Sequence, residues 1–402
     1  MSQPRPLTAA FLTVLFDLLS FSLMIPDIQP RLDSKGYPGA LIGFTIAAYS
    51  ISQLLFGAPL GRWSDRVGRR KTLLITTGFS VFAAALYALS DNLGWMIASR
   101  VLLGIAGANL GVAYAYVSDV TEPSKRASAM GKLGMAFGIG FMFGPIIGAV
   151  LVQAGAGSPV LLAGASTFMA IVNFVFVLLF LPDVPPIQES SETSGLNPAR
   201  KLIKALRTPG LGTLLVLFFV ANFAFANLES TFFRLLMSRL NLNHTEVAIP
   251  GAAILVFVGI IAAAVQGGVV GKLVARFGEL RLMRVGYMIQ SPALAVIPFI
   301  PFWVPFLIGA LILGFGSGIS SPSLTSLISR TAPKGMAGGI FGVTQSLGAL
   351  ARVVSPVIGN SLFDVGSWVP YALAGFLMLT PLILALRFKE SDGGMIAQGG
   401  SA

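Results

Sequence analysis

Long apolar runs separated by short polar stretches cover most of the chain. Each run is about 20 residues or longer, and a helix of that length crosses the roughly 30 Å hydrocarbon core of a bilayer. A helix is favoured there because it satisfies its own backbone hydrogen bonds in lipid. The pattern predicts an all-α membrane protein with twelve membrane-spanning helices, over residues 7–31, 40–62, 72–90, 94–118, 127–153, 160–181, 210–238, 247–274, 282–300, 303–329, 336–362 and 368–387.

The composition excludes an ordinary soluble protein. Of the 402 residues, 55% are hydrophobic and 11% are charged, whereas soluble domains carry about 25% charged residues. The chain has no cysteine and one histidine, His244, so disulfides, thiol chemistry and the usual metal-binding spacings are not expected. We interpret His244 as a solvated loop residue. The first apolar run lacks a cleavage site, so we expect a retained helix and not a signal peptide.

The net charge of +11 comes from an uneven distribution of lysine and arginine among the predicted loops. The loops that would face one side contain only Arg31, Lys35 and Arg239, while those on the other side contain most of the 27 basic residues. By the positive-inside rule, this predicts a multi-pass inner-membrane protein with both termini in the cytoplasm. A nucleic-acid partner is not expected, because such a protein would gather its basic residues in one groove or on one helix.

The chain is expected to form two related halves. Residues 1–181 would form an N-terminal six-helix bundle, residues 182–209 a polar cytoplasmic linker, and residues 210–402 a C-terminal six-helix bundle with a short cytoplasmic tail. The halves resemble each other at an offset of about 210 residues, so that Gly57, Gly61, Arg62, Arg66, Gly68 and Lys71 match Gly267, Gly271, Lys272, Arg276, Gly278 and Arg281. Duplicated halves suit alternating access, in which the halves rock about a central site.

Five ionisable residues are predicted to lie within the membrane helices or near their outer ends, namely Asp17, Asp27, Arg100, Glu229 and Arg352. Such groups cost at least about 2.5–3.5 kcal/mol each at a helix centre, so they usually face a cavity or a partner. In a low-dielectric site, Asp17 or Glu229 can bind a proton or a cationic substrate but not both, which is antiport in its simplest form. The structural alternatives are carboxylates satisfied by neighbouring helices, with Asp27 meeting Arg31 four residues on. Arg352 would either pair with Glu229 or receive an anionic group.

Polar and aromatic side chains at the same predicted depth complete the candidate site. They are Tyr49, Gln53, Asn109, Tyr114, Asn222, Phe225, Asn227, Gln290 and Gln345. A cavity that mixes such residues with Met and Phe suits amphipathic and structurally varied substrates.

Several motifs resemble those of a known family. The loop GAPLGRWSDRVGRRK (57–71) resembles the signature loop of the major facilitator superfamily. RVLLGIAGANLG (100–111) and GIGFMFGPIIGA (138–149) resemble the fourth-helix and fifth-helix motifs of its drug:proton antiporters. Residues 6–30, with an acid early in the first helix, are similar to the tetracycline-exporter branch. The resemblance covers nearly the whole chain and implies the twelve-helix fold in two pseudo-symmetric bundles.

The resemblance also implies roles for two sets of residues. A cytoplasmic lock would stabilise the outward-facing state, and we assign to it Gly57, Gly61, Asp65, Arg66, Arg70, Asp119 and Arg126. A helix bend that sets exchange over uniport would be formed by Gly140, Gly144, Pro145 and Gly148. Topology signals, helix capping and close packing are the alternative explanations of both sets. The second-half loop has Ala275 where the first has Asp65, so we expect weaker charge interlocking there.

The predicted function is therefore secondary active transport, not catalysis. We expect proton-coupled efflux of small lipophilic or cationic organic compounds, driven by a proton gradient without a cofactor. The alternative is a carrier of organic anions or lipid-like molecules that uses Arg352 and Arg100. No HExxH, P-loop or nucleophile motif supports an enzyme. The expected partners are a small organic substrate, protons and membrane lipids, and we expect a monomer.

Overall fold

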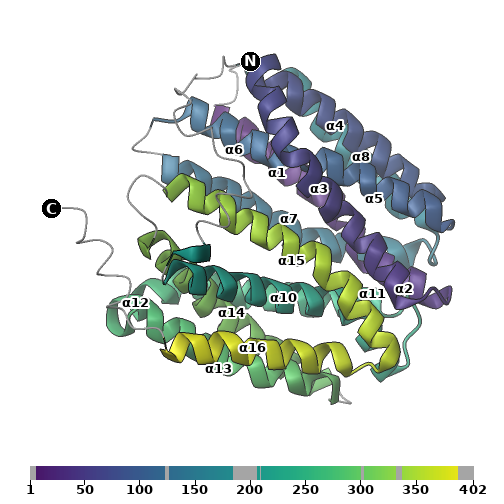
Figure 1. Cartoon of the computed structure of the whole chain (residues 1–402). Coiled ribbons are helices and arrows are strands. Elements are labelled where there is room, and N and C mark those ends of the chain that lie inside the picture. The colour runs from purple at the N-terminus through teal and green to yellow at the C-terminus, as the bar shows by residue number, and fades with distance from the viewer. Residues whose placement is uncertain are drawn as a thin grey trace. The chain divides into compact units, whose positions relative to one another are not determined.

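A computed structural model describes residues 6–122, 126–183, 206–208, 210–299, 303–331 and 337–387, and these residues are almost entirely helical (Figure 1). The predicted linker, including its basic part, lies mostly outside the described residues. The N-terminal helices are α1 (Pro6–Ser22), α2 (Ile25–Ser34), α3 (Gly39–Val67), α4 (Arg69–Leu86), η1 (Tyr87–Leu89), α5 (Leu93–Gly107), α6 (Asn109–Val120), α7 (Arg126–Ala154) and α8 (Pro159–Phe180).

The second part of the chain repeats this succession of long helices. They are α10 (Leu211–Leu240), α11 (Ala248–Ala264), η3 (Val265–Val269), α12 (Val270–Phe277), α13 (Glu279–Val296), η4 (Ile297–Phe299), α14 (Trp303–Thr331), α15 (Ala337–Val365) and α16 (Val369–Arg387). Among the described residues, ten helical stretches are long and apolar enough to cross a membrane. Each predicted span coincides with a helical stretch, so the all-α membrane fold is confirmed.

Two of the predicted spans are interrupted. The first is divided into α1 and α2 at Leu23 and Met24. Pro26 lies just beyond this break, and a proline has no N–H to donate to the carbonyl four residues earlier. The fourth span is divided into α5 and α6 at Ala108, within a segment that contains Gly104, Gly107 and Gly111. Glycine is a poor helix former, which is consistent with an interruption of the helix in this segment.

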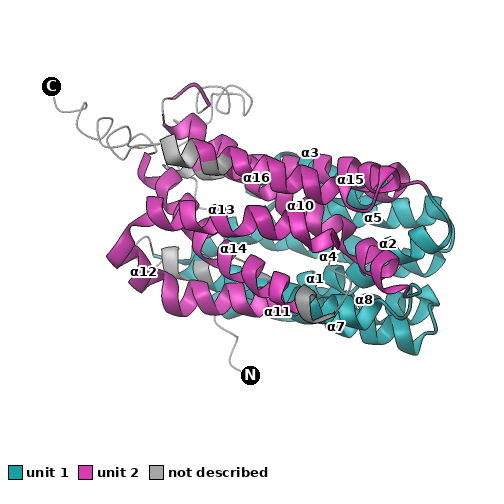
Figure 2. Cartoon of the chain, turned by 90° about the horizontal axis from the view of Figure 1, so that it is seen from below, with its two compact units in different colours: residues 1–37, 44–190, 242–256 teal, residues 38–43, 191–241, 257–402 magenta. Residues whose placement is uncertain are grey.

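The chain forms two compact units (Figure 2). Unit 1 contains residues 1–37, 44–190 and 242–256, and unit 2 contains residues 38–43, 191–241 and 257–402. In unit 1, α1 packs against α7 and α8, and α4 packs against α5 and α8. In unit 2, α10 packs against α15 and α16, and α13 packs against α14 and α16. The two units therefore have equivalent pairs of packed helices.

Candidate transport site

Asp17 lies in the middle of α1 and has only neutral hydrogen-bond partners. The hydroxyl of Ser80 in α4 donates a 3.1 Å hydrogen bond to its Oδ1, and the side chain of Asn109 at the start of α6 also bonds it. Within the described part of the chain, no lysine or arginine lies at ion-pair distance from this carboxyl. Three helices of unit 1 thus hold an acidic group that has no cation at ion-pair distance in the part of the chain that the structure describes.

Arg100 lies in α5 of the same unit and is 2% exposed. The guanidinium is 5.2 Å from the ring centre of Phe21 and 5.6 Å from that of Tyr49, which are distances for cation–π attraction. Within the described residues, neither Nε nor Nη2 has a hydrogen-bond partner. This buried cation therefore has two donor nitrogens without a partner among the described residues.

Tyr49 and Gln53 of α3 are held against α5 by its glycines. A Cβ on Gly107 would lie 3.0 Å from Cζ of Tyr49, so only glycine leaves space for the phenol. Gln53 Nε2 donates a 3.0 Å hydrogen bond to the Gly107 carbonyl. The structure therefore places five of the predicted site residues of the first half on helices of unit 1, namely Asp17, Asn109, Arg100, Tyr49 and Gln53.

Three of the predicted site residues of the second half, Glu229, Asn222 and Arg352, lie near one another on α10 and α15. The cation of Arg352 interacts electrostatically with Glu229. Asn222 donates from Nδ2 to the Phe218 carbonyl at 2.8 Å. A Cβ on Gly348 would lie 3.8 Å from Asn222 Oδ1 and 3.9 Å from Arg352 Nη1, so both side chains lie beside this glycine. Arg352 and, nearer the start of α15, Gln345 are exposed on the surface of unit 2.

A small pocket within unit 2 contains two further residues from the predicted list. Gln290 is held by a 2.9 Å hydrogen bond to the Ser320 hydroxyl and a 3.1 Å hydrogen bond to the Gly286 carbonyl. The pocket is mostly apolar with a few polar groups, as is common for sites that bind small organic molecules. Its lining consists of Phe225, Leu228, Val258, Gln290, Leu294, Leu313, Ser317 and Met378.

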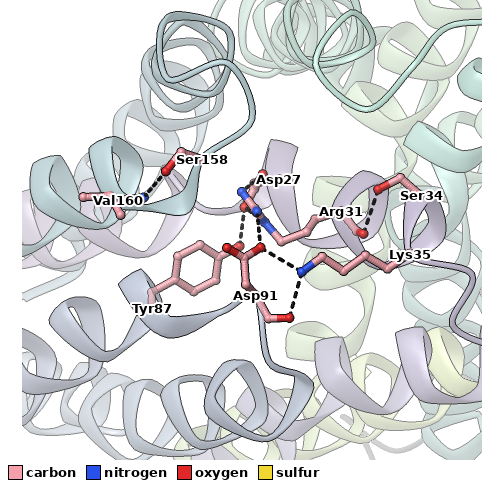
Figure 3. A network of polar contacts seen from close by, with 8 residues as sticks. All are labelled: Asp27, Arg31, Ser34, Lys35, Tyr87, Asp91, Ser158 and Val160. Carbon is pink, nitrogen blue, oxygen red and sulfur yellow. Dashed lines mark hydrogen bonds and ion pairs between the residues drawn. The ribbon is translucent and has the colours of Figure 1, made fainter.

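Asp27 is in a different environment from Asp17, within a network of polar contacts at one end of unit 1 (Figure 3). Its carboxylate is fully buried and accepts two hydrogen bonds from Arg31, at 2.8 Å from Nε and 2.9 Å from Nη2. The hydroxyl of Tyr87 donates a third, at 2.7 Å. The structure thus shows the pairing with Arg31 that the spacing of four residues allows, and it does not bring Asp27 together with Asp17.

The same network continues to the surface through Asp91, between η1 and α5. Arg31 Nη1 lies 3.2 Å from Asp91 Oδ1, and Lys35 Nζ lies 2.7 Å from the same oxygen. The hydrogen bond from Lys35 holds the pKa of Asp91 below its ordinary value, with a further contribution from Arg31. The network therefore ties α2 to the segment that follows α4.

The predicted lock residues of unit 1 are connected by a residue that was not among them. Arg69, the first residue of α4, forms ion pairs with Asp65 and, at 3.0 Å, with Asp119. Although it belongs to a loop rich in basic residues, Arg69 is buried, with 8% of its surface exposed. Arg66 is exposed, and Arg70 donates to the Leu178 carbonyl at 2.7 Å.

Three other residues of the predicted lock, Gly57, Gly61 and Arg126, are not joined to Arg69 by any ion pair or side-chain hydrogen bond within the described part of the chain. Among the described residues, no atom lies within 4 Å of a Cβ added to Gly57 or Gly61, so their packing there does not require glycine at either position. The side chain of Arg126 lies outside the described residues. No local sequence signal distinguishes Arg69 from its basic neighbours, because its partner Asp119 is 50 residues away.

Unit 2 contains an ion pair at the equivalent place with reversed polarity. Glu279 is the first residue of α13, at the repeat offset of 210 from Arg69, and lies 3.0 Å from Arg330 near the end of α14. The Ser326 hydroxyl also donates to Glu279 at 3.2 Å. Ala275 cannot form an ion pair in the second-half loop, but Glu279 and Arg330 form one close by.

The glycines of the fifth predicted span allow close packing of α7 on α1. A Cβ on Gly140 would lie 2.7 Å from Cβ of Leu18, and one on Gly144 would lie 2.7 Å from Cβ of Ser22. A Cβ on Gly148 would lie 2.8 Å from the carbonyl carbon of Leu23. The Ser22 hydroxyl donates to the Gly140 carbonyl at 2.9 Å. Pro145 follows within the same helix, which continues to Ala154.

Comparison with known proteins gives a consistent assignment. The sequence matches the family model of the Major Facilitator Superfamily over residues 10–356. It is 30% identical to the class D tetracycline resistance protein of Salmonella ordonez, covering 90% of each chain. It is 27% identical to multidrug resistance protein 2 of Bacillus subtilis (strain 168), covering 92% of each chain.

The fold is similar to that of a solved transporter. The structure of the human organic anion transporter MFSD10 (TETRAN) matches with a TM-score of 0.68 and 24% identity, covering 95% of this chain and all of that one. The matched family consists of membrane transporters and not of enzymes. With its multi-pass helical fold and a match over most of its length, the chain belongs to the Major Facilitator Superfamily.

Proposed function

We propose that this transporter exports small lipophilic or cationic organic compounds in exchange for protons, by alternating access. The observation that carries the proposal is the environment of Asp17. Its carboxyl lies in a membrane-spanning helix, bonded by Ser80 and Asn109, with no basic partner at ion-pair distance among the described residues. An ionised carboxylate in such a place needs a counter-charge, which a proton or a cationic substrate can supply.

Competition between these two ligands is sufficient for exchange. When the substrate binds, the proton must leave, and when the proton binds, the substrate is released. Glu229 offers a second carboxyl in unit 2, where Arg352 interacts with it. The pocket that contains Phe225 and Gln290 offers apolar surface for the rest of a substrate. The names of the tetracycline and multidrug resistance relatives support export of organic compounds.

The same proposal includes location and orientation. Basic residues gather in the loops around residues 62–71 and 272–284, and the positive-inside rule would place these loops in the cytoplasm. Both termini would then be cytoplasmic. We also propose that the chain lies in the inner membrane and acts as a monomer.

Organic anions are the second candidate substrates, because two arginines, Arg100 and Arg352, lie within membrane-spanning helices. Arg100 has two nitrogens without partners among the described residues, and Arg352 is exposed in the middle of a membrane-spanning helix. An exposed guanidinium at that depth is expected to face water or a polar ligand and not lipid. The similarly folded human protein MFSD10 is an organic anion transporter, which supports this second candidate.

A proton-release experiment on purified protein separates the two candidates. Lipophilic cations, neutral compounds and organic anions are added in turn to weakly buffered protein, and the pH change and the bound fraction are measured. We expect cations to release protons from the parent protein and to release far fewer from Asp17→Asn and Glu229→Gln.

Asp183 is an exposed acid that follows α8 in the chain, so Asp183→Asn serves as the matched control and should behave as the parent does. Cations that bind the parent without releasing protons would contradict the proposal. Anions that bind in preference to cations, with a loss of binding in Arg352→Gln, would establish the second candidate instead.

A further inference from the structure

Asn173 in α8 is an amide side chain that is buried inside unit 1 without a bonding partner. The residue is 1% exposed, and neither its Oδ1 nor its Nδ2 has a hydrogen-bond partner among the described residues. Buried amides are nearly always bonded, because a donor and an acceptor left without partners cost free energy. Asn173 therefore offers a donor and an acceptor to a small polar molecule within the bundle.

The helices α1 and α8 pack against each other in opposite directions. A hydrogen bond of 2.9 Å joins the hydroxyls of Ser20 and Ser166, and the ring centres of Phe16 and Phe176 are 6.1 Å apart. Residue numbers thus fall along α1 as they rise along α8. These two contacts relate positions on one helix to positions on the other.

Asn173 on α8 and Asp17 on α1 both lie between these two contacts. Asn173 is seven residues from Ser166, which is about two turns, so it is on the same face of α8, turned toward α1. Asp17 is three residues from Ser20, which is about 60° around the axis of α1. The unbonded amide is therefore in the same part of unit 1 as the acid.

Threonines of α1 and α4 add two acceptors at this level. A Cβ on Gly78 would lie 3.7 Å from the ring of Phe174, so their chain neighbours Thr77 and Asn173 are at one level of α4 and α8. Thr13 is one turn from Asp17 on α1, and both threonines are buried. Their hydroxyls donate to carbonyls of their own helices, which leaves the hydroxyl oxygens free to accept a hydrogen bond.

No titratable side chain of the helices packed on α1 is at the level of Asp17. These helices are α4, α6, α7 and α8, and α8 contains no charged residue. In the other three, the charged residues are at least about eight positions, or 12 Å, from the residue that contacts Asp17 or its neighbour Leu18. They are Arg69, Arg70 and Lys71 in α4, Asp119 in α6, and Arg126 and Lys132 in α7. Arg100 of α5 lies against Phe21, one turn beyond Asp17, and is the same in the parent and in every variant below.

We propose that Asn173, Thr13 and Thr77 hold a water molecule beside Asp17, and that this water donates a hydrogen bond to the ionised carboxylate. A buried water typically makes about three hydrogen bonds to polar groups that would otherwise be unsatisfied. Asn173 is a positioning residue, because it acts on the carboxylate through the water. The inference rests on the proposed proton exchange at Asp17 and adds the group that stabilises the ionised acid when neither proton nor substrate is bound.

An infrared titration without substrate tests the water site. The protonated carboxyl of Asp17 is identified as the band that Asp17→Asn removes, and its intensity is followed against pH. Leucine is close to asparagine in size and has no polar atom, so in Asn173→Leu the carboxylate loses the hydrogen bond from the water. We expect the midpoint of protonation to rise by about one pH unit, the scale of one hydrogen bond to a charged group. Asn173→Thr, which keeps a hydroxyl, should remain closer to the parent.

Two further measurements separate this role from general packing. Ser166→Ala removes a hydroxyl contact between α8 and α1 without removing the amide, so it should leave the midpoint unchanged. The melting temperature of Asn173→Leu should not fall, because no hydrogen bond within the described part of the chain is lost. If Asn173→Leu does not reach the membrane, Asn173→Val replaces it.

An unchanged midpoint in the apolar variant of Asn173 would overturn the water site, and so would an equal rise in Ser166→Ala. The titration needs neither substrate nor a proton gradient. A substrate that binds without displacing the proton would contradict the proposed exchange, while the shift in the midpoint would still decide whether the water site exists.

Discussion

Two acids in helices of the same unit, Asp17 and Asp27, differ in what neutralises them. Asp27 accepts a bidentate pair from Arg31 and a hydrogen bond from Tyr87, so its charge is matched within the fold. Asp17 has hydrogen bonds from Ser80 and Asn109, which are neutral groups. A buried ion pair needs to remain ionised to keep its geometry, whereas an acid among neutral donors can gain and lose a proton with little rearrangement. This difference is why we assign coupling to Asp17.

The network around Asp27 has a predictable pH dependence at its surface residue, Asp91. Lys35 and Arg31 lower the pKa of Asp91, so this acid binds protons more weakly in the folded protein than in the unfolded chain. Its contribution to stability is therefore fully present above the ordinary aspartate value of about 3.9 and is lost as the pH falls through the lower folded value.

We expect Asp91→Asn to lower the free energy of unfolding by at most about 1 kcal/mol at neutral pH, because the side chain is 65% exposed and its pairs are screened by solvent. Melting temperatures of parent and variant in detergent, measured between pH 7 and pH 3, check this. The difference should persist at pH 5 and shrink below about pH 4. A difference that grows as the pH falls would contradict the assignment.

At the level of helices, the same contact is built with opposite charges in the two units. Arg69 is at the first residue of α4, where the helix dipole disfavours a cation, so it depends on Asp65 and Asp119. Glu279 is at the first residue of α13, where the dipole favours an anion, and its partner Arg330 is exposed. Arg69 therefore depends more on its acidic partners than Glu279 depends on Arg330.

Removing the partner should reveal this difference. We expect Asp119→Asn to destabilise the protein by about 2–3 kcal/mol, because it leaves a buried arginine with one of its two acids. Arg330→Gln should cost less than about 1 kcal/mol, because an exposed pair contributes little. Thermal unfolding in detergent measures both. As a control, the reversed pair Arg69→Glu with Asp119→Arg should recover part of the lost stability. Equal destabilisation by Asp119→Asn and Arg330→Gln would count against the interpretation.

The positions of the helices could be predicted from the sequence, but their breaks and long-range contacts could not. Runs of about 20 apolar residues are a strong signal because the bilayer sets the required length. The break before Pro26 has a local cause, the missing N–H of proline, which apolar run length alone does not reveal. The contacts Arg69–Asp119 and Gly39–Asp364 join residues 50 and 325 positions apart, and no periodicity within either helix indicates them.

The site was partly predictable for the same physical reason. An ionisable residue within an apolar run is easy to recognise in a sequence. This is how the candidates Asp17, Arg100, Glu229 and Arg352 could be predicted. Which partner neutralises each of them depends on how neighbouring helices pack. The pairing of Arg234 with Asp364, in place of its neighbour Glu229, is an example that only the structure shows.

For the molecule as a whole, duplication explains both the equivalent packing and the exchange of segments between units. Residues 38–43 at the start of α3 belong to unit 2, and residues 242–256, which include the start of α11, belong to unit 1. These helices are related by the repeat offset of about 210 residues. Each unit therefore contains the beginning of a helix that continues in the other, which suits a transporter whose halves move as bodies.

Coupled transport is the property that these features have to produce, and reconstituted protein tests it directly. In proteoliposomes with an acidic interior, the parent should accumulate a permanently charged aromatic ammonium compound as protons leave, since such a compound cannot be trapped by protonation. Asp17→Asn should lose this gradient-driven accumulation, while Asp183→Asn should retain it. Accumulation by Asp17→Asn at the rate of the parent, in vesicles holding the same pH gradient, would contradict proton coupling through this carboxyl.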